Sequence, residues 1–275
     1  MKHSKKIFAV FYLFIGFVTA TYAQAPVAAT AIDLALPSGT RWANMNVGAE
    51  KTEDYGLFFA WGETVGYGSD VSDGRGFSWG WYKWSRYGSR DYMTKYTPYS
   101  YYGSGPVDYK SELDMEDDAA YINWGGEWRM PTFTEIKELI DNTTQTFVSQ
   151  NGVSGQLFTS KINGNSIFLP ASGIRQDNRI LAQGTEGIYW SRNLSVNNHD
   201  MGGVLIFTST SVSTNGYPRC DGIVVRPVTS TGESGIDNVK NDPNENTVYY
   251  DLQGRFVKQP TRGVYIVKEK KVFVK

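Results

Sequence analysis

The fold is decided by the stretch EDDAAYINWGGEWRMPTFTEIKELIDN, residues 116–142. It predicts two short helices joined by a tight turn. The acidic residues 116–118 suit a first helical turn, where unpaired N–H groups and the helix dipole favour negative charge. The glycine pair at 125–126 ends that helix. Thr132 and Glu135 have the spacing of a capping box, which begins the second helix. Three apolar residues of the second helix predict one buried stripe: Ile136, Leu139 and Ile140.

Large apolar side chains lie between the two helices, at Trp124, Trp128 and Met130, in a run too short to form its own core. The segment WRMPTFTE, residues 128–135, resembles the Trp-Arg-Leu-Pro-Thr-x-x-Glu signature of the lectin-like fold of formylglycine-generating enzymes, with Met130 in place of Leu. Five more motifs strengthen the resemblance: DLALPSGTRWA at 33–43, NVGA at 46–49, FAWGET at 59–64, NGNSIFLPA at 163–171 and YWS at 189–191.

Together these motifs resemble the Fibrobacter-type major paralogous domain, a C-type-lectin-like domain of the surfaces of some Gram-negative bacteria, over about residues 31–228. The resemblance implies a fold in which the first and last strands meet and the loops between late strands form the ligand face. It implies no single biochemical activity.

Strand signals surround the helices. Short apolar or alternating runs predict strands on both sides of a turn at 37–39, at 57–61, in a hairpin over 158–169, and at 187–191, 202–208 and 222–228. Strands that follow a pair of helices favour an α+β fold over a doubly wound sheet. We therefore expect an α+β, C-type-lectin-like domain with two short helices and an antiparallel sheet.

The chain divides into four segments. Residues 1–23 read as a signal peptide, with three lysines, an apolar run over 7–20 and a small-x-small cleavage site. The lectin-like domain is expected over 24–228, and a Ser-, Gly-, Asp- and Asn-rich linker over 229–246. Residues 247–275 alternate in hydropathy and predict a small β-module. This tail resembles a type IX secretion sorting domain, which implies the secretion machinery as a partner.

Composition excludes several functions. The 27 basic residues do not exceed the 28 acidic ones, which disfavours nucleic acid as a partner. Cys220 is the only cysteine and His199 the only histidine after the leader, so a zinc site, a disulfide and a catalytic triad are not expected. The cysteine pair that formylglycine-generating oxidases use is also missing. We expect no metal, no cofactor and no catalysis.

Two weaker alternatives stay open. Acidic residues at 114 and 116–118 offer oxygen ligands for calcium, although helix capping explains them more simply. Glu63 and Glu127 could form a glycosidase pair, which requires a carboxylate separation that sequence does not give. The apolar run of the leader is too short for a bilayer, so no transmembrane helix is expected in the mature chain.

Aromatic residues crowd the segment 66–109, which has little periodicity and predicts a long coil. The rings could stack on sugars or could hold the coil on the core. We favour packing for Trp81 and Trp84, and exposure for Tyr99, Tyr101 and Tyr102.

Polar residues suited to recognition cluster in three expected loops, 173–185, 192–201 and 209–221. The alternative is ordinary turn chemistry. With two tyrosines of the coil, the candidate ligand contacts are Arg175, Asp177, Asn178, Arg192, Asn197, His199, Tyr217, Arg219, Tyr99 and Tyr101.

The sequence therefore predicts an exported, cell-surface or secreted binding module that recognises carbohydrate or protein through these loops. A structural or adhesive surface component without a soluble ligand is the main alternative, and a glycan-active enzyme is a weaker one.

Overall fold

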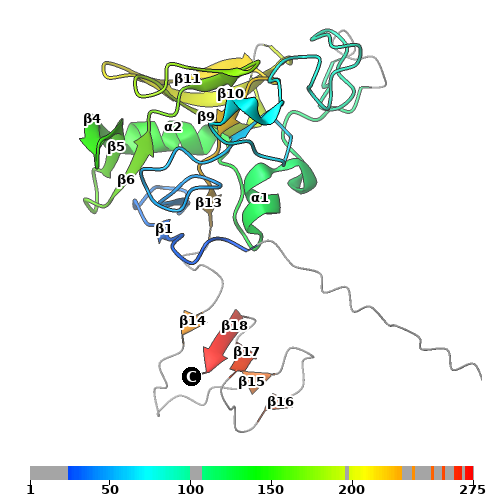
Figure 1. Ribbon diagram of the computed structural model, residues 1–275. Helices are drawn as coiled ribbons and strands as arrows, with labels where there is room; N and C mark the ends of the chain where they lie inside the picture. The colour runs from blue at the N-terminus through cyan, green and yellow to red at the C-terminus, as the bar shows by residue number, and fades with distance from the viewer. Residues whose placement is uncertain are drawn as a thin grey trace, which may run out of the picture.

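A computed structural model describes residues 24–99, 107–195 and 198–230, together with short strands in the C-terminal tail. The signal-peptide prediction for 1–23 lies outside the described residues, as do Tyr101, Tyr102 and Asn197. The described chain contains more strand than helix and has two α-helices, α1 and α2, so its fold is α+β (Figure 1).

The two-helix prediction is confirmed. Helix α1 spans Ala119–Trp124 and ends at Gly125, whose φ is 65°. Helix α2 spans Phe133–Asn142, and Thr132 and Glu135 form the expected capping box. One detail differs: Asp118 is the N-cap of α1, whereas residues 115–117 form a separate 3-10 turn, η3. Asp118 also accepts the backbone N–H of Met130, so one buried carboxylate joins both ends of the turn.

A five-stranded sheet lies at the centre of the domain, in the order β11-β10-β9-β12-β3. Its strands are β3 (Phe58–Phe59), β9 (Gly187–Leu194), β10 (Met201–Phe207), β11 (Val212–Pro218) and β12 (Ile223–Val224). Indole N–H groups fix the middle of the sheet: Trp190 donates to Phe59 O at 2.7 Å, and Trp61 donates to Ser191 O at 2.9 Å. Buried indoles usually find such acceptors, and these two bonds tie the segment 59–61 to β9.

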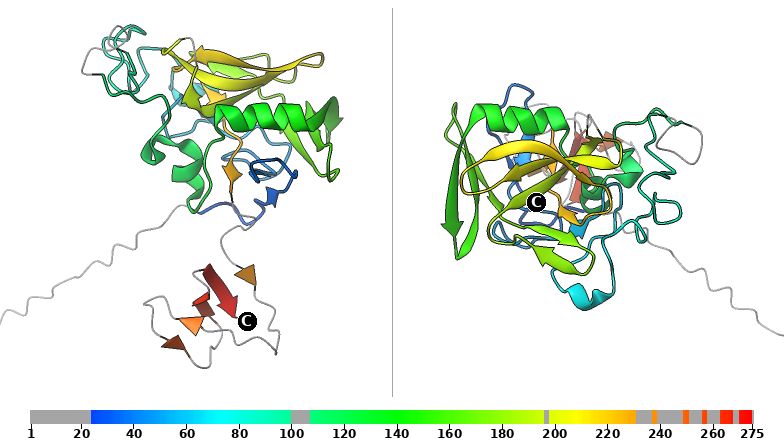
Figure 2. Two further views of the ribbon diagram at one scale, coloured as in Figure 1. Left: turned by 180° about the vertical axis from the view of Figure 1, so that it is seen from behind. Right: turned by 90° about the horizontal axis from the view of Figure 1, so that it is seen from above.

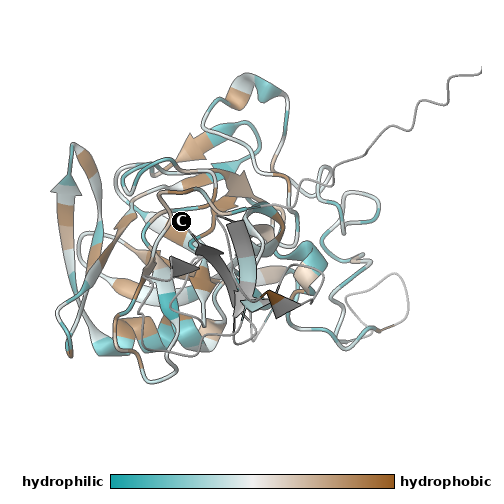
Figure 3. Cartoon of the chain, turned by 90° about the horizontal axis from the view of Figure 1, so that it is seen from below, coloured by the Kyte–Doolittle hydropathy of each residue, from teal (hydrophilic) through white to brown (hydrophobic). Residues whose placement is uncertain are grey.

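A second antiparallel sheet follows α2 without a loop. Its strands are β4 (Thr143–Gln150), β5 (Val153–Ser160) and β6 (Ser166–Pro170), in the order β4-β5-β6. The hairpin expected around 163–164 is confirmed as β5 and β6. Helix α2 lies alongside this sheet and the central one (Figure 2). The longer helix carries both hydrophobic and hydrophilic residues (Figure 3), which fits its one buried stripe of Ile136 and Leu139.

The two ends of the domain meet in a third sheet. Strand β2 (Arg41–Ala43) pairs with β1 (Ala31–Ile32) on one side and with β13 (Val228–Thr229) on the other. The expectation that the first and last strands meet is therefore confirmed. The segment WRMPTFTE also contacts this third sheet, because Arg129 and Val228 exchange backbone hydrogen bonds.

The expected late loops are largely strands, which corrects the sequence analysis. Residues 174–181 form the hairpin of β7 (Ile174–Gln176) and β8 (Arg179–Leu181). Most of 209–221 is β11, which pairs with β10 over its whole length. Successive side chains of a strand point to opposite faces of the sheet. Polar residues that are neighbours in these two segments therefore do not all lie on one face.

The coil between residues 66 and 99 is held by its aromatic side chains. Tyr82 and Tyr96 are buried, and Trp61 and Trp84 both make edge contacts with Tyr96. The coil projects to one side of the sheets (Figure 1). Packing by Trp84 is confirmed, since it is partly buried against both core clusters, but Trp81 is 55% exposed, so the packing role expected of it is wrong.

The C-terminal tail contains a sheet of its own, in the order β14-β18-β17-β15-β16. The strands are β14 (Asp237–Asn238), β15 (Tyr249–Tyr250), β16 (Phe256–Val257), β17 (Gly263–Val267) and β18 (Lys270–Val274). Strands β15 to β18 pair antiparallel as the alternation predicts. Strand β14 falls within the expected linker, where none was predicted, and pairs in parallel with β18.

Candidate functional site

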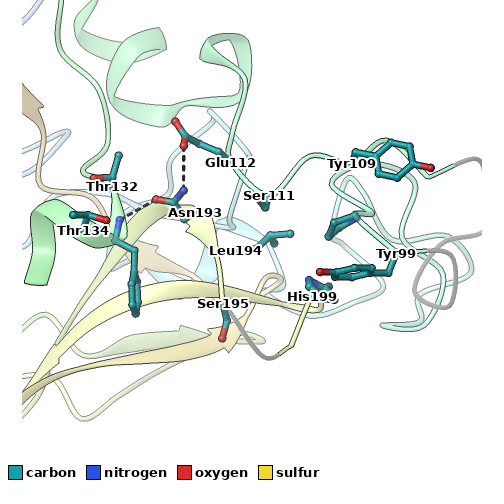
Figure 4. A pocket seen from close by; sticks show the side chains of 12 residues that line it. Tyr99, Tyr109, Ser111, Glu112, Thr132, Thr134, Asn193, Leu194, Ser195 and His199 are labelled. Atoms are coloured by element: carbon teal, nitrogen blue, oxygen red, sulfur yellow. Dashed lines mark hydrogen bonds between the residues drawn. The ribbon is translucent and has the colours of Figure 1, made fainter.

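A surface pocket of about 670 Å³ forms where the aromatic coil, the start of α2 and the end of β9 converge (Figure 4). Tyrosine and phenylalanine rings share its wall with hydroxyl, amide and carboxylate groups. Its lining residues are Pro98, Tyr99, Tyr109, Ser111, Glu112, Thr132, Phe133, Thr134, Asn193, Leu194, Ser195 and His199.

One wall of the pocket is a backbone pairing between two distant segments. Leu113 N donates to Arg192 O at 2.9 Å, and Leu194 N donates to Ser111 O at 2.8 Å. The segment 111–113 thus runs beside the end of β9 like a short extra strand. Backbone hydrogen bonds make this wall rigid, so the side chains on it have fixed origins.

The carboxylate of Glu112 is the anchored charged group of this wall. Its Oε1 lies 3.1 Å from Arg192 Nε, and its Oε2 accepts a hydrogen bond from Asn193 Nδ2 at 3.2 Å. Asn193 Oδ1 in turn accepts the backbone N–H of Phe133 at 2.9 Å, at the first residue of α2. Figure 4 draws both hydrogen bonds of Asn193 as dashed lines, one to Glu112 and one to the backbone N–H at the start of α2. Glu112 remains exposed, so it can still accept hydrogen bonds from a ligand.

The opposite wall is aromatic. The rings of Tyr99 and His199 lie 4.6 Å apart at an interplanar angle of 52°, and Tyr99 is half exposed. Burial and the nearby Arg219 guanidinium lower the pKa of His199, which keeps its ring neutral at physiological pH. A neutral imidazole beside a phenol offers flat apolar surface with polar tips. The structure therefore brings together Tyr99 and His199, two of the predicted contacts.

The three arginines among the predicted ligand contacts are buried, so they are not available on the surface as that prediction requires. Arg175 has no exposed surface and forms a two-pronged pair with Asp73, at 2.6 and 2.8 Å. Arg219 is equally buried and donates to the backbone oxygens of Lys95, Tyr96 and His199. Arg192 holds Glu112 and Leu113 O. These guanidinium groups position loops instead of facing solvent.

Of the other predicted contacts that the structure describes, Asp177, Asn178 and Tyr217 lie outside the pocket. Asp177 and Asn178 are exposed at the turn between β7 and β8, where Asp177 O accepts the N–H of Phe77. Tyr217 is half-buried on β11 and packs against the core. Nothing in their positions joins them to Tyr99 and His199. Asn193 was among the polar residues of the 192–201 loop, but no local pattern marked Glu112.

The acidic cluster considered for calcium already holds a cation. Lys95 Nζ lies 2.6 Å from Asp117 Oδ2, 2.8 Å from Asp114 Oδ2 and 3.5 Å from Glu116 Oε1. Burial alone would lower the pKa of Lys95, but its bonds to Asp114 and Asp117 raise it instead. The ammonium therefore occupies the point where these three carboxylates converge, and a calcium ion would have to displace it.

The two glutamates considered for catalysis differ in their surroundings. Glu63 is buried, and its carboxylate accepts bonds from Arg75 Nη2 and from the backbone N–H of Lys83, both at 2.7 Å. Glu127 is exposed. Cys220 is a buried free thiol, as expected, and burial raises its pKa, which opposes reactivity as a thiolate.

No protein-family model matches the sequence, and searches of the curated proteins and of the solved structures find no significant match. In the part of the chain that the structure describes, every helix is too short or too polar to cross a bilayer.

Proposed function

We propose that the protein is an exported, non-catalytic binding module of the C-type-lectin-like class that takes a neutral carbohydrate segment into the pocket of Figure 4. The leader supports export, and the ordered motifs at 33–64 and 128–191 support the lectin-like class. The coarse α+β architecture with joined ends is compatible with it. The resemblance of 247–275 to a sorting domain suggests the type IX secretion machinery as the route to the cell surface.

A single observation carries the proposed ligand class: a fixed carboxylate faces the same pocket as exposed aromatic rings. Glu112 is oriented by Arg192 and Asn193 before any ligand arrives. A carboxylate accepts hydrogen bonds from two neighbouring sugar hydroxyls, and charged acceptors make the stronger bonds. Tyr99 and His199 offer rings on which the C–H face of a sugar can pack.

Charge disfavours an anionic ligand in this pocket. Glu112 is its only acidic lining residue, and the described lining contains no lysine or arginine. An anionic sugar would meet repulsion without a compensating cation. This pocket also differs from an ordinary solvated surface because Glu112 and Asn193 are already hydrogen-bonded. Binding therefore costs little side-chain conformational entropy.

The test is a glycan array probed with the chain from residue 24 onward, with calcium and with chelator, followed by titration of the best neutral hit. Glu112→Gln keeps the shape and the bond from Asn193 but removes the charge, and should weaken binding about tenfold, near 1.4 kcal/mol. Tyr99→Ala should weaken it by a similar factor. Glu127→Gln, an exposed carboxylate outside the pocket, is the matched control.

Binding should not need calcium, because Lys95 occupies the acidic cluster. A blank array with a cooperatively folded protein would overturn the carbohydrate proposal in favour of a protein ligand. Equal affinities for the three variants would show that the sugar binds elsewhere than in this pocket.

A further inference from the structure

A second pocket, of about 230 Å³, lies just beyond the C-terminal end of α2. It forms between strands β4 and β5 and the turn that joins β10 to β11. Its lining residues are Gln145, Phe147, Gln156, Thr208, Ser209, Thr210, Ser211 and Val212, and we call it the glutamine pocket. The described linings of this pocket and of the pocket in Figure 4 share no residue.

Gln156 is a buried polar residue on a largely apolar face. It lies on β5 and is 3% exposed, and its Oε1 has no hydrogen-bond partner in the part of the chain that the structure describes. Its neighbours across the sheet are Phe147 on β4 and Leu169 on β6. A buried amide oxygen without a partner lowers stability, and an apolar side chain of the same shape would avoid that cost. Packing therefore does not explain a glutamine here, and an unpaired oxygen at a pocket points to a ligand that donates to it.

A second amide of the same face has a fixed orientation. Gln145 Nε2 donates to Ile140 O and to Thr143 O, both at 2.7 Å, at the end of α2. Gln145 lies two residues before Phe147, which is paired with Gln156, so the two glutamine side chains lie on one face of the sheet. Because its N–H groups are used, Gln145 offers its Oε1 to a ligand. The pocket therefore has two amide oxygens as acceptors.

Hydroxyl groups of the turn 208–211 form the opposite wall. Thr208 N donates to Ser211 O at 2.9 Å, and the hydroxyl oxygens of these two residues lie 3.0 Å apart. Thr210 N donates to Thr208 Oγ1 at 3.3 Å. The turn is thus held by its own side chains before any ligand binds. A hydroxyl both donates and accepts, so this wall can serve a carbonyl oxygen of a ligand as well as its O–H groups.

The chemistry of the lining restricts the ligand. All eight lining residues are neutral, so an ion would lose its hydration without a countercharge. Phe147 and Val212 supply apolar surface beside the amides, and both pack against the core. The volume is below the roughly 300–1,000 Å³ of pockets for drug-sized molecules, which suits one small unit. The ligand should therefore be small and neutral, with an N–H donor next to an apolar group.

We propose that the glutamine pocket binds the acetamido group of one N-acetylhexosamine unit. The amide N–H of the sugar donates to Gln156 Oε1, its methyl group packs on Phe147 and Val212, and its carbonyl oxygen accepts from the hydroxyls of the turn. The last torsion of a glutamine side chain has a broad energy minimum, so the Gln156 amide can turn toward the donor. A peptide has the same amide groups, but it needs a groove for several residues, whereas this lining ends at one turn.

The test is an NMR titration of the ¹⁵N-labelled chain from residue 24 onward. The two probes are methyl N-acetyl-β-glucosaminide and methyl β-glucoside, and the readout is the side-chain amide signals of Gln145 and Gln156. The acetamido sugar should shift both signals to saturation and bind at least about tenfold more tightly than the glucoside, because only its N–H and methyl group match the pocket. This readout is local, so binding at the pocket of Figure 4 does not mimic it.

Gln156→Met separates a binding role from a structural one. Methionine keeps the approximate shape but has no amide, so binding of the acetamido sugar, followed at Gln145, should weaken by about tenfold or more. The thermal midpoint should stay the same or rise, because a buried unpaired oxygen is removed. Gln150→Met, on β4 but outside the pocket, is the matched control and should leave binding unchanged. Glu112→Gln should also leave it unchanged, so the two pockets are tested separately.

Equal binding of the two glycosides would overturn the proposal. So would the absence of any saturable shift, which would leave Gln156 bound to ordered water only. A shift produced as strongly by N-acetylglycine N-methylamide would assign the pocket to a peptide instead. A Gln156→Met variant that keeps its sugar affinity but unfolds at a lower temperature would show that the amide has only a structural role.

Discussion

Buried arginines tie the irregular coil to the sheets. Arg175 on β7 reaches Asp73, and Arg219 after β11 reaches backbone oxygens of the coil at Lys95 and Tyr96. A guanidinium has five donors in a rigid fork, so one side chain can satisfy several carbonyl groups that no strand pairs. Such a residue replaces the hydrogen bonds that regular structure would supply, which explains why a coil this long is ordered.

Sequence alone could not reveal this role. The partners of Arg175 lie 100 to 107 positions away, and those of Arg219 within the coil lie 123 to 137 positions away. Near each arginine the chain is rich in Asn, Asp and Gly, which is also the composition of a solvated turn. The ligand assignment failed at these positions because local composition does not report burial.

Asp221 gives the fold a pH dependence. Burial raises its pKa to about 6 from an ordinary value of 3.8, and the hydrogen bond from Gln176 offsets only part of that effect. The folded state therefore holds a proton that the unfolded state has lost between about pH 4 and 6, so this residue reduces stability as pH rises through that window. Asp221→Asn should raise the free energy of unfolding at pH 7 by about 1–3 kcal/mol.

Urea unfolding of the native chain and this variant at pH 4 and pH 7 measures the effect. The gain should nearly vanish at pH 4, where the native carboxyl is protonated in the folded state. Glu127→Gln, on an exposed side chain, should change stability little at either pH. A gain of equal size at both pH values would contradict the assignment to Asp221 ionisation.

Whole elements were predicted well where they carry a local signal. Helix α2 has an amphipathic stripe and a capping box, and the β5–β6 hairpin has an Asn-Gly turn. Strands β4 and β11 were missed. Their sequences, TTQTFVSQ and VSTNGYP, are polar because one face of each is exposed, and β4 follows α2 with no turn residue between them. Tertiary pairing with β5 and β10 determines them more than propensity does.

Lys95 connects the coil to η3, and a substitution of Lys95 should therefore lower the stability of the domain. Lys95→Met keeps the length of the side chain but leaves Asp117, which is 3% exposed, without its closest cation. We expect a loss of about 1–3 kcal/mol, since the buried Asp117 carboxylate loses its closest cation and keeps only Lys83, at 3.2 Å, and the hydroxyl of Tyr96. The variant should also gain stability from calcium, because three carboxylates then converge on an empty position. Thermal unfolding with calcium and with chelator measures both effects.

Lys110 supplies a matched control at the same cluster. Its ammonium lies 2.6 Å from Asp114, but the side chain is 44% exposed and the pair is of the ordinary i,i+4 kind. Lys110→Met should therefore cost less than about 1 kcal/mol and should bring no response to calcium. Equal losses for the two lysines would show that Lys95 is not the main anchor.

At the scale of the whole molecule, the pocket forms from segments that the sequence keeps apart. Residues 98–99 and 109–112, the start of α2, and residues 193–195 with His199 meet because the segment 111–113 pairs with β9 and the relay through Asn193 reaches α2. Tyr99 was predicted as an exposed tyrosine of the coil and His199 as a polar residue of a late loop. Glu112 was not, because its importance comes from Arg192 and Asn193, 80 residues later.

The closure of the domain by β13 predicts where the chain can be shortened. Both described core clusters lie within residues 29–228, and Val228 is fully buried beside Trp42. A chain of residues 24–230 should therefore keep the thermal midpoint of the domain and its binding to the pocket ligand. Residues 24–226 lack β13 and the partner of Arg129 N, and should lose more than the roughly 1.5–3 kcal/mol of one buried valine. Calorimetry of the two truncations tests this directly. If both lose stability alike, the tail beyond residue 230 contributes to the domain, and the boundary drawn here is wrong.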